Sequence, residues 1–389
     1  MPQTREVILV LERSRAYGRR LIRGIVRYAK THDPWLFHME PEFYRHSPQH
    51  PQAWITSLQA DGIIAHLGDG RVLKNVMDLR IPAIITSIRE PIAQTHAIES
   101  NDEAIGRMAV DYFLGRGFHH FAYCGFDGMH WSKRRGESFR RTVTQAGREI
   151  CVYEQPRRKN LRTAEDEQPF LVDWLRSLPK PTALLTCNDD RGRQVLITCK
   201  TARLKVPDDI AILGVDDDEF VCETTHPQLS SINLGVEAAG YAAAVLLRDL
   251  MAEPKLDREK ERITVSPLYV AERQSTDVLA TKDREVAAAL RFIREHVRET
   301  VQVRNIAEAA GLSRRALQQR FSKVTGHPVH DEIKRSRVDH MARMLTSTNL
   351  SITEIARLFQ CAEVNNISRY FRQQTGLTPS QYRKMHSIR

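Results

Sequence analysis

The sequence contains no apolar run that approaches the roughly 20 residues of a membrane-spanning helix. It also shows no secretion signal, because the first five residues lead straight into an expected strand. Its 389 residues, 41% of them hydrophobic, suffice for about two to three domains with proper cores. We therefore expect a multidomain protein that works in the cytoplasm.

Cysteine pairs and metal-ligand patterns are missing as well. The fifteen histidines show no metal-ligand spacing, and the six cysteines are scattered without a C-x-x-C pair. These cysteines are Cys124, Cys151, Cys187, Cys199, Cys222 and Cys361. We expect reduced, mostly buried thiols, no zinc site and no cofactor.

Motifs of catalysis and nucleotide binding are also absent. The chain has no G-x-G-x-x-G, no P-loop, no H-E-x-x-H and no G-x-S-x-G. Acidic residues cluster at Asp216, Asp217 and Asp218, but no base or metal-ligand cluster accompanies them. The sequence therefore predicts a protein that is not an enzyme.

The last hundred residues contain one pattern twice, at 306–321 and at 355–371. Each copy opens with Ile-Ala in a short apolar helix, breaks, and continues as a second helix. In the first copy Gly311 supplies the turn, because glycine takes positive φ without steric cost. Ser313 is placed to cap the following helix. The pattern predicts two helix-turn-helix units.

The second helix of each unit carries polar side chains that suit DNA. In the first unit Leu317 and Phe321 form the expected buried stripe, which leaves the opposite side to solvent. Arginine and glutamine on such a surface bind phosphate or base edges. The expected DNA-binding residues are Arg314, Arg315, Gln318, Gln319, Asn365, Asn366 and Arg369. A plain helical bundle with a solvated basic face is the alternative.

The closing segment 371–383, which reads FRQQTGLTPSQYR, resembles the signature that ends the DNA-binding domain of the AraC/XylS family. The resemblance covers roughly residues 284–389 and implies an all-α domain with two helix-turn-helix units. One feature differs, since Gln360 and Cys361 stand where the family usually has a glycine and an aromatic residue. We expect a strained or differently shaped second turn there.

Charge also separates this segment from the rest of the chain. Residues 284–389 contain 19 Lys and Arg against 9 Asp and Glu, whereas the whole chain contains 58 against 48. The excess of positive charge therefore lies entirely in the segment, and the preceding residues are neutral. A basic surface releases counterions from the phosphate backbone, so we expect salt-dependent binding to promoter DNA.

The first 275 residues alternate short apolar strands with amphipathic helices. Clear strands lie at 6–11, 182–186 and 210–215, and clear helices at 17–30 and 102–116. Such alternation argues for parallel sheets built of βαβ units. The fold class is therefore α/β, followed by the all-α segment.

Five segments of this region resemble sugar-binding domains of the LacI/ribose-binding-protein type. They are residues 60–64, 117–125, 188–192, 206–216 and 272–277. The resemblance implies a two-lobed, periplasmic-binding-protein-like sensor over residues 1–276, with ligand closing the cleft between the lobes. The expected bounds are 5–125 plus 233–260 for the first lobe, 126–232 plus 261–276 for the second, 277–288 for a linker and 289–389 for the DNA-binding domain.

The order of the segments is informative. LacI relatives carry their helix-turn-helix at the N-terminus, whereas this chain carries it at the other end. This order, with Ala16-Tyr17 and the segment 131–139 in register, is similar to that of bacterial activators of xylose operons. The resemblance implies D-xylose or a related pentose as effector, with RNA polymerase as a partner. A homodimer is expected, because two DNA-binding domains supply avidity.

A pyranose offers hydroxyls and an apolar ring face, so its site needs carboxylates, amides, an arginine and an aromatic platform. The expected ligand-binding residues are Tyr17, Asn101, Asp102, Trp131, Arg135, Asn188, Asp189 and Asp216. Alternatives stay open. Asp216 is otherwise a turn cap, Arg135 an interlobe ion pair and Trp131 a core residue. Tyr17 otherwise lines the site without direct contact, and either Asn101 or Asp102 makes the contact.

The sequence thus predicts a sugar-responsive transcription activator associated with the nucleoid. Residues 279–299 are expected to connect sensor and DNA-binding domain. The helix expected at 329–347 would separate the two recognition helices by about 28 Å, close to one DNA turn of about 34 Å. The alternatives are a transport or chemoreception binding protein, a repressor that responds to a different sugar, and a sugar-converting enzyme.

Overall fold

The structure is a computed structural model of the chain. It describes residues 4–32, 34–39, 55, 58–67, 76–87, 95–156, 163–253, 260–278, 283–360 and 364–386, apart from the side chains of 164, 347 and 364–366. The chain divides into two compact units. The first comprises Met1–Asn101, Gly128–Arg134 and Gly235–Ser266, and the second comprises Asp102–Asp127, Arg135–Leu234 and Pro267–Arg389.

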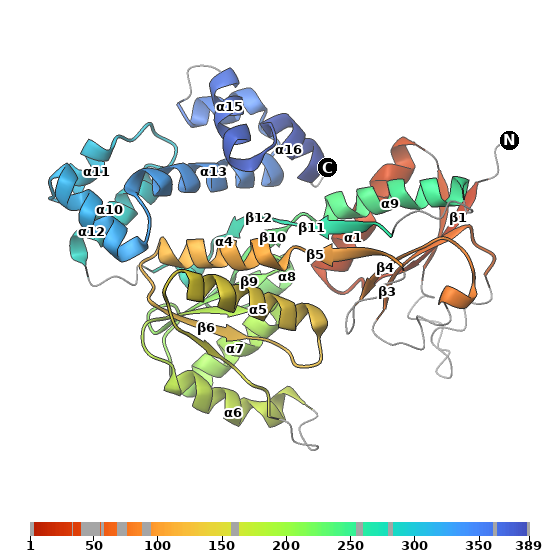
Figure 1. Ribbon diagram of the computed structural model, residues 1–389, viewed down its shortest axis with the longest axis horizontal. Coiled ribbons are helices and arrows are strands. Elements are labelled where there is room, and N and C mark those ends of the chain that lie inside the picture. The colour runs from red at the N-terminus through yellow and green to blue at the C-terminus, as the bar shows by residue number, and fades with distance from the viewer. Residues whose placement is uncertain are drawn as a thin grey trace. The chain divides into compact units, whose positions relative to one another are not determined.

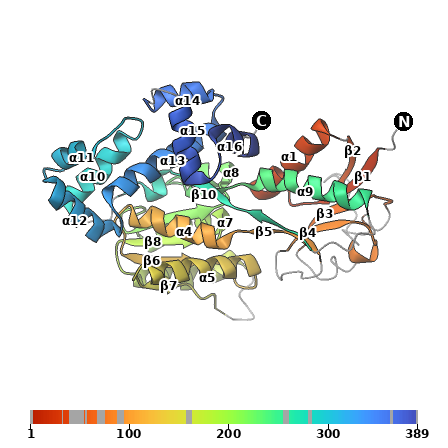
Figure 2. The same ribbon diagram turned by 45° about the horizontal axis from the view of Figure 1, so that its top comes forward.

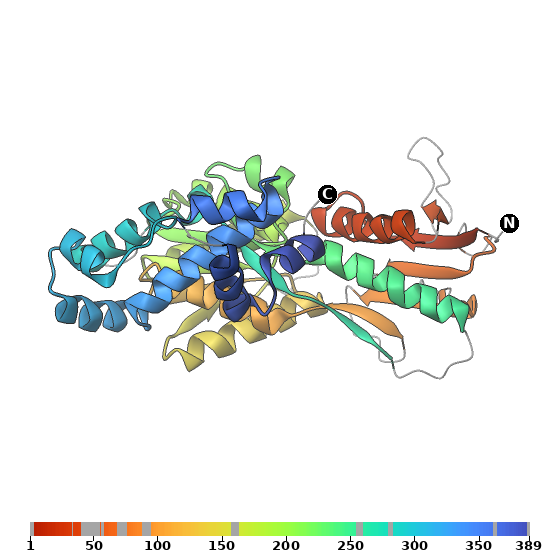
Figure 3. The same cartoon turned by 90° about the horizontal axis from the view of Figure 1, so that it is seen from above.

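The first unit is built on a six-stranded sheet in the order β11-β5-β4-β3-β1-β2 (Figure 1). All its strand pairs are parallel. The strands are β1 (Arg5–Val10), β2 (Trp35–Met39), β3 (Gly62–Leu67), β4 (Ala83–Ser87), β5 (His96–Ser100) and β11 (Arg262–Val265). Helices α1 (Ala16–Thr31) and α9 (Val236–Ala252) pack side by side (Figure 3). Ile8 and Ile63 are fully buried in the core beneath.

The second unit contains a six-stranded sheet in the order β12-β10-β9-β8-β6-β7. Its pairs are parallel except that β12 runs antiparallel to β10. The strands are β6 (His120–Cys124), β7 (Ile150–Val152), β8 (Thr182–Thr186), β9 (Ile210–Val215), β10 (Ser230–Leu234) and β12 (Pro267–Ala271). Strands β8, β9 and β10 are buried along their whole length, as parallel strands covered on both faces should be.

Short helices complete this part of the second unit. They are α4 (Asp102–Leu114), α5 (His130–Gln145), α6 (Ala164–Ser177), α7 (Asp189–Ala202), α8 (Glu219–Glu223) and the 3-10 helix η1 (Gln274–Thr276). The first turn of α5, up to Arg134, belongs to the first unit, and the remainder of this helix, from Arg135, belongs to the second unit.

The C-terminal part of the second unit is all helical. Its helices are α10 (Arg284–Glu295), α11 (Val303–Ala309), α12 (Arg314–Thr325), α13 (Val329–Ser347), α14 (Ile352–Leu358), α15 (Val364–Thr375) and α16 (Pro379–His386). Figure 2 shows α10–α12 and α14–α16 as two groups joined by α13. Each group has its own apolar core, centred on Phe321 in the first and on Phe371 in the second. The predicted fold class is confirmed.

Two expected lobe boundaries are wrong. Strand β6 was expected in the first lobe, but it pairs with β7 and β8 in the second sheet. Strand β11 was expected in the second lobe, but it pairs with β5 in the first sheet. The chain leaves the first sheet before α4, because Phe113 of this helix packs against Phe118 and Phe121 of the second unit.

The expected linker also differs. Helix α10 begins at Arg284, inside the predicted linker 277–288, because Asp283 caps its first turn by accepting a hydrogen bond from the backbone N–H of Val286 at 3.0 Å. Residues 279–282 lie outside the described residues.

Candidate functional site

Arg135 is the centre of a buried polar cluster in the second unit. It lies on α5 and is only 2% exposed. Its Nε donates to Oδ1 of Asp102 at 3.3 Å, and its Nη1 donates to the carbonyl oxygen of Cys187. The arginine therefore ties the start of α4 to the carboxyl end of β8. Ligands of open α/β sheets bind at such strand ends.

Asp216 joins this cluster through charge. Burial lowers the pKa of the Arg135 guanidinium, but the carboxylates of Asp102 and Asp216 raise it more, so the arginine stays charged. Asp216 and Asp217 follow β9 with φ of 105° and 50°, in the region that non-glycine residues rarely adopt. Such backbone persists where neighbouring contacts fix it, and it concentrates at ligand sites.

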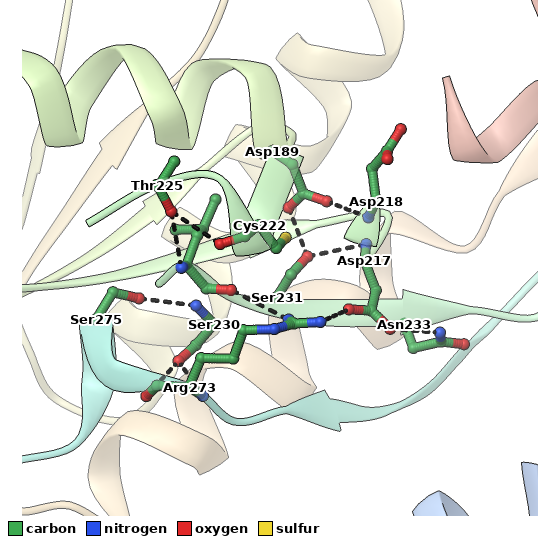
Figure 4. A network of polar contacts seen from close by, with 11 residues as sticks. Asp189, Asp217, Asp218, Cys222, Thr225, Ser230, Ser231, Asn233, Arg273 and Ser275 are labelled. Atoms are coloured by element: carbon green, nitrogen blue, oxygen red, sulfur yellow. Dashed lines mark hydrogen bonds and ion pairs between the residues drawn. The ribbon is translucent and has the colours of Figure 1, made fainter. Parts of the chain in front are cut away.

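Asp189 braces the segment after β9 (Figure 4). Its Oδ1 accepts a hydrogen bond from Oγ of Ser231 at 2.5 Å, and its Oδ2 accepts one from the backbone N–H of Asp218 at 2.7 Å. Burial, followed by the charge of Asp216, raises the pKa of Asp189 well above its ordinary value. The carboxyl group therefore holds a proton more readily than an ordinary aspartate does, and it positions Asp216 through this segment.

Asp217 is held from the other side (Figure 4). Nη2 of Arg273 donates to its Oδ1 at 2.9 Å, and Nδ2 of Asn233 donates to its Oδ2 at 2.8 Å. Neither Asn233 nor Ser231 is among the residues expected from the sequence. The signal that could have found them is a run of polar residues inside the buried strand β10.

The structure brings together five of the eight expected ligand-binding residues. Asn188 lies in the same loop after β8, between Cys187 and Asp189, and its Oδ1 caps α7 by accepting from the backbone N–H of Arg191 at 3.0 Å. The five residues are Asp102, Arg135, Asn188, Asp189 and Asp216. They surround the carboxyl ends of β8 and β9, where hydroxyl groups of a small ligand would find both donors and acceptors.

The other three expected residues belong to the first unit. The ring of Tyr17, on α1, lies 6.2 Å from the ring of His66. Nδ2 of Asn101 donates to Oγ of Ser266 at 3.5 Å, so of the neighbours Asn101 and Asp102 it is Asp102 that joins the Arg135 cluster. Trp131 lies in the first turn of α5. Their contacts with ligand stay predictions.

The first helix-turn-helix unit has the expected local geometry. Gly311 takes a φ of 66°, and Oγ of Ser313 accepts from the backbone N–H of Ala316 at 3.2 Å to cap α12. Leu317 and Phe321 are fully buried. The four expected DNA-binding residues of this helix, Arg314, Arg315, Gln318 and Gln319, are all exposed. Arg320 is different, because its guanidinium donates to Asp283 and Glu285 at 2.8 Å each.

The second helix-turn-helix unit repeats this geometry with a different residue at the turn. Ser351 and Glu354 form a capping box that starts α14, and Ile367 and Phe371 are the buried stripe of α15. Arg369 is exposed. Cys361 and the side chains of Asn365 and Asn366 lie outside the described residues. Gln360 takes a φ of 52° at the position that corresponds to Gly311, so the expected strain at this turn is present.

We expect Gln360→Gly to stabilise the second helix-turn-helix unit by about 1 kcal/mol. The left-handed conformation costs an L-residue about 1–2 kcal/mol, and glycine avoids that cost. Amide hydrogen exchange of α14 and α15, which reports local opening, should slow about fivefold. The matched control is Gly311→Gln, the reverse change, which should speed exchange in α11 and α12. Unchanged or faster exchange in Gln360→Gly would show that the turn is not strained.

Two features of other protein classes are absent from the part of the chain that the structure describes. It contains no helix long and apolar enough to cross a membrane. It also contains no group of three or more His, Cys, Asp or Glu side chains that could hold a metal ion.

Two family models match the chain. Residues 110–276 match the periplasmic binding protein-like domain, and residues 306–385 match a helix-turn-helix domain. The first match covers the sheet of the second unit and its polar cluster apart from Asp102, and the second covers both helix-turn-helix units. The expected combination of sensor and DNA-binding domain is confirmed.

Known proteins share this combination over nearly their whole length. The xylose operon regulatory protein of Escherichia coli K12 is 28% identical over 98% of this chain and 97% of its own. That of Haemophilus influenzae is 26% identical over 97% of this chain and 98% of its own. The solved structure of a xylose-binding transcription activator covers 99% of both chains, with a TM-score of 0.61 and 26% identity. The expected resemblance is confirmed, and these relatives are transcriptional regulators.

Proposed function

We propose that this chain, with its periplasmic-binding-protein-like sensor and its C-terminal helix-turn-helix domain, is a sugar-responsive transcription regulator. The observation that carries the proposal is the presence of both parts in one chain, in the same order and over nearly the same length as in the xylose operon regulatory proteins. A protein of this kind acts where the chromosome lies, so we assign it to the cytoplasm and the nucleoid. We assign it no catalytic activity.

We propose D-xylose or a related pentose as the effector. Similarity to xylose operon regulatory proteins and to a xylose-binding activator supports xylose as the sugar. The charged and polar side chains around Arg135 can form hydrogen bonds with sugar hydroxyls. In our account Arg135, Asn188 and Asp216 bond to sugar hydroxyls, while Asp102 and Asp189 position them. Calorimetric titration with a panel of pentoses and hexoses tests the assignment. D-xylose or another pentose should bind more tightly than any hexose, and a chain that binds no pentose would contradict it.

We propose that α12 and α15 are the recognition helices. Helix α13, with 19 residues, would place them about 28 Å apart, close to the spacing of successive major grooves. Arg314, Arg315, Gln318 and Gln319 would contact bases and phosphates from α12, and Asn365, Asn366 and Arg369 from α15. A homodimer that activates transcription through RNA polymerase completes the proposal, because paired domains supply avidity.

Arg315→Ala should weaken binding to the cognate promoter by about 1–3 kcal/mol and relax base preference at one position. The fold should survive, because Leu317 and Phe321 carry the core of this helix. Fluorescence anisotropy with labelled promoter DNA measures the loss. The matched control is Arg320→Ala on the same helix, whose guanidinium is bonded to acidic side chains. Equal affinities of Arg315→Ala and the unmodified chain would remove α12 as a recognition helix.

A further inference from the structure

Helix α4 has its two ends at two different sites of the second unit. Its first residue, Asp102, is 4% exposed and accepts the hydrogen bond from Arg135 in the proposed sugar site. Its last turn and the residues that follow, 112–116, face the DNA-binding domain. The helix has 13 residues and therefore spans about 20 Å as one rigid element.

The contact at the far end of α4, here called the junction, begins with Arg116. Its guanidinium forms an ion pair with Glu272, which directly follows β12, and lies 3.5 Å from the centre of the Tyr112 ring. The hydroxyls of Tyr112 and Thr276 share a hydrogen bond of 2.6 Å. The charge of Arg116, followed by that of Arg294 on α10, overcomes the effect of burial and lowers the pKa of Glu272 to about 2. Arg116 and Glu272 of the sensor and Arg294 of the DNA-binding domain line one cavity and so form a partly buried charge cluster.

Two side chains of α13 reach Gly115, the residue that follows α4. On α13, Arg335 and Glu332 form an ion pair, and Glu332 is buried. Any side chain at Gly115 would overlap the guanidinium of Arg335 and crowd the carboxylate of Glu332. The absence of a side chain at Gly115 leaves room for the Arg335 guanidinium at this position, and a larger residue would displace it.

Apolar contacts and a cavity extend the junction. Tyr269 of β12 packs in the same core as Met341 and Leu345 of α13, and the hydroxyl of Tyr382 donates to the carbonyl oxygen of Leu268 at 3.2 Å. Beside them lies a cavity of about 310 Å³. Its lining includes Arg116 and Glu272 from the sensor and Arg294, Asp339 and Arg343 from the DNA-binding domain.

Burial perturbs the charged groups of this cavity. It lowers the pKa of Arg294 to about 10, with the charge of Arg116 adding to the effect, and it raises the pKa of Asp339 to about 6. Buried charges tolerate a loss of partners poorly. A small displacement of α4 would therefore change the energy of the junction markedly.

We propose that α4 transmits the effect of sugar binding to the DNA-binding domain. The helix would do so by moving Tyr112, Gly115 and Arg116 relative to their partners at the junction. These partners are Glu272, Glu332 and Arg335. A sugar that bonds to Arg135 changes how this side chain holds Asp102, and the rigid helix carries that change to α13. Coupling of two sites requires such a shared element, whose position both ligands influence. The inference rests on the proposed function, and it assigns to α4 the role that the sequence suggested for residues 279–299.

The test uses the intact chain with Gly115→Ala, which crowds Arg335, and separately with Glu272→Gln, which weakens the ion pair with Arg116. Each variant is titrated with D-xylose without DNA, and with promoter DNA in the presence and absence of D-xylose. Sugar affinity without DNA should stay within about twofold of the unmodified chain. The factor by which sugar changes DNA affinity, typically about 5–150-fold, should fall below about threefold. A purely structural role would not change this factor while leaving sugar binding intact.

The matched control is Arg107→Ala, which removes an exposed ion pair with Glu103 from the same helix and should leave the factor unchanged. If either junction variant fails to fold, Tyr112→Phe, which loses only the hydroxyl contact to Thr276, should still reduce the factor. Junction variants that keep the full factor would overturn the role of α4 and leave the proposed function standing. An unmodified chain that binds DNA equally with and without every sugar would overturn both.

Discussion

Replacing Arg135 by alanine should abolish measurable sugar binding and destabilise the second unit by about 3–5 kcal/mol. The substitution removes an ion-pair partner of Asp102, which is 4% exposed, and a donor to the carbonyl oxygen of Cys187. It also leaves Asp216 without the positive charge that faces it. Breaking a buried ion pair costs more free energy than the pair contributes, so we expect losses in both sugar binding and stability.

Urea unfolding measures the loss of stability, and calorimetric titration with D-xylose measures the loss of binding. The matched control is Arg134→Ala, the preceding residue. Its side chain is 40% exposed and its ion pair with Glu99 spans 3.4 Å, so its removal should cost less than about 1 kcal/mol. If Arg135→Ala unfolds at the same urea concentration as Arg134→Ala and still binds sugar, the cluster is not the sugar site.

The second large effect is expected at Arg191, which has no exposed surface. Its two terminal nitrogens donate to the carboxylate of Glu167 at 2.9 and 2.7 Å, and its guanidinium lies 4.8 Å from the centre of the Phe126 ring. Arg191→Leu leaves Glu167 buried without its charge partner. We expect a loss of about 3–5 kcal/mol in the free energy of unfolding.

The double variant Arg191→Leu with Glu167→Leu should recover most of this loss, because an apolar pair leaves no charge uncompensated. Arg193→Ala, an exposed arginine on the same helix, is the control and should change stability by less than about 0.5 kcal/mol. A double variant no more stable than Arg191→Leu would mean that the arginine acts through packing and not through Glu167.

The pair at Arg191 also predicts a pH dependence. Burial raises the pKa of Glu167, but hydrogen bonds and charge from Arg191 lower it more, to below its ordinary 4.5. The stability that this lowered pKa contributes is present above pH 4.5 and is lost as the pH falls through the folded-state value. Urea unfolding at pH 7 and pH 4 should therefore show a smaller difference for the double variant than for the unmodified chain.

Local features of the structure could be predicted from the sequence. Strands 182–186 and 210–215 and the helix 329–347 have the expected bounds, because an apolar run or a helical period is encoded in neighbouring residues. The burial of Leu317 and Phe321 follows from the same periodicity. The strained turn at Gln360 was expected because glycine is missing there.

Features that depend on distant residues could not be predicted. The sheet to which β6 belongs depends on its pairing with β7 and β8. The alternation of strands and helices along the sequence is the same in both lobes, so it does not show where one lobe ends and the other begins. Arg116 and Glu272 are 156 residues apart, and Asp217 and Arg273 are 56 apart. Asn188 and Asp216 could be proposed because they follow expected strands, and Arg135 because it lies in the segment 131–139 that carries the resemblance. Nothing local to the sequence indicates the contacts that hold Arg135 to Asp102 and to Cys187.

The central claim is that sugar binding and promoter binding are coupled in one chain. Calorimetric titration of the intact protein with D-xylose, alone and with saturating promoter DNA, tests it most directly. Linkage requires that DNA change the sugar affinity by the factor by which sugar changes the DNA affinity, and we predict a factor of roughly 5–150. Equal sugar affinities with and without promoter DNA would contradict the account.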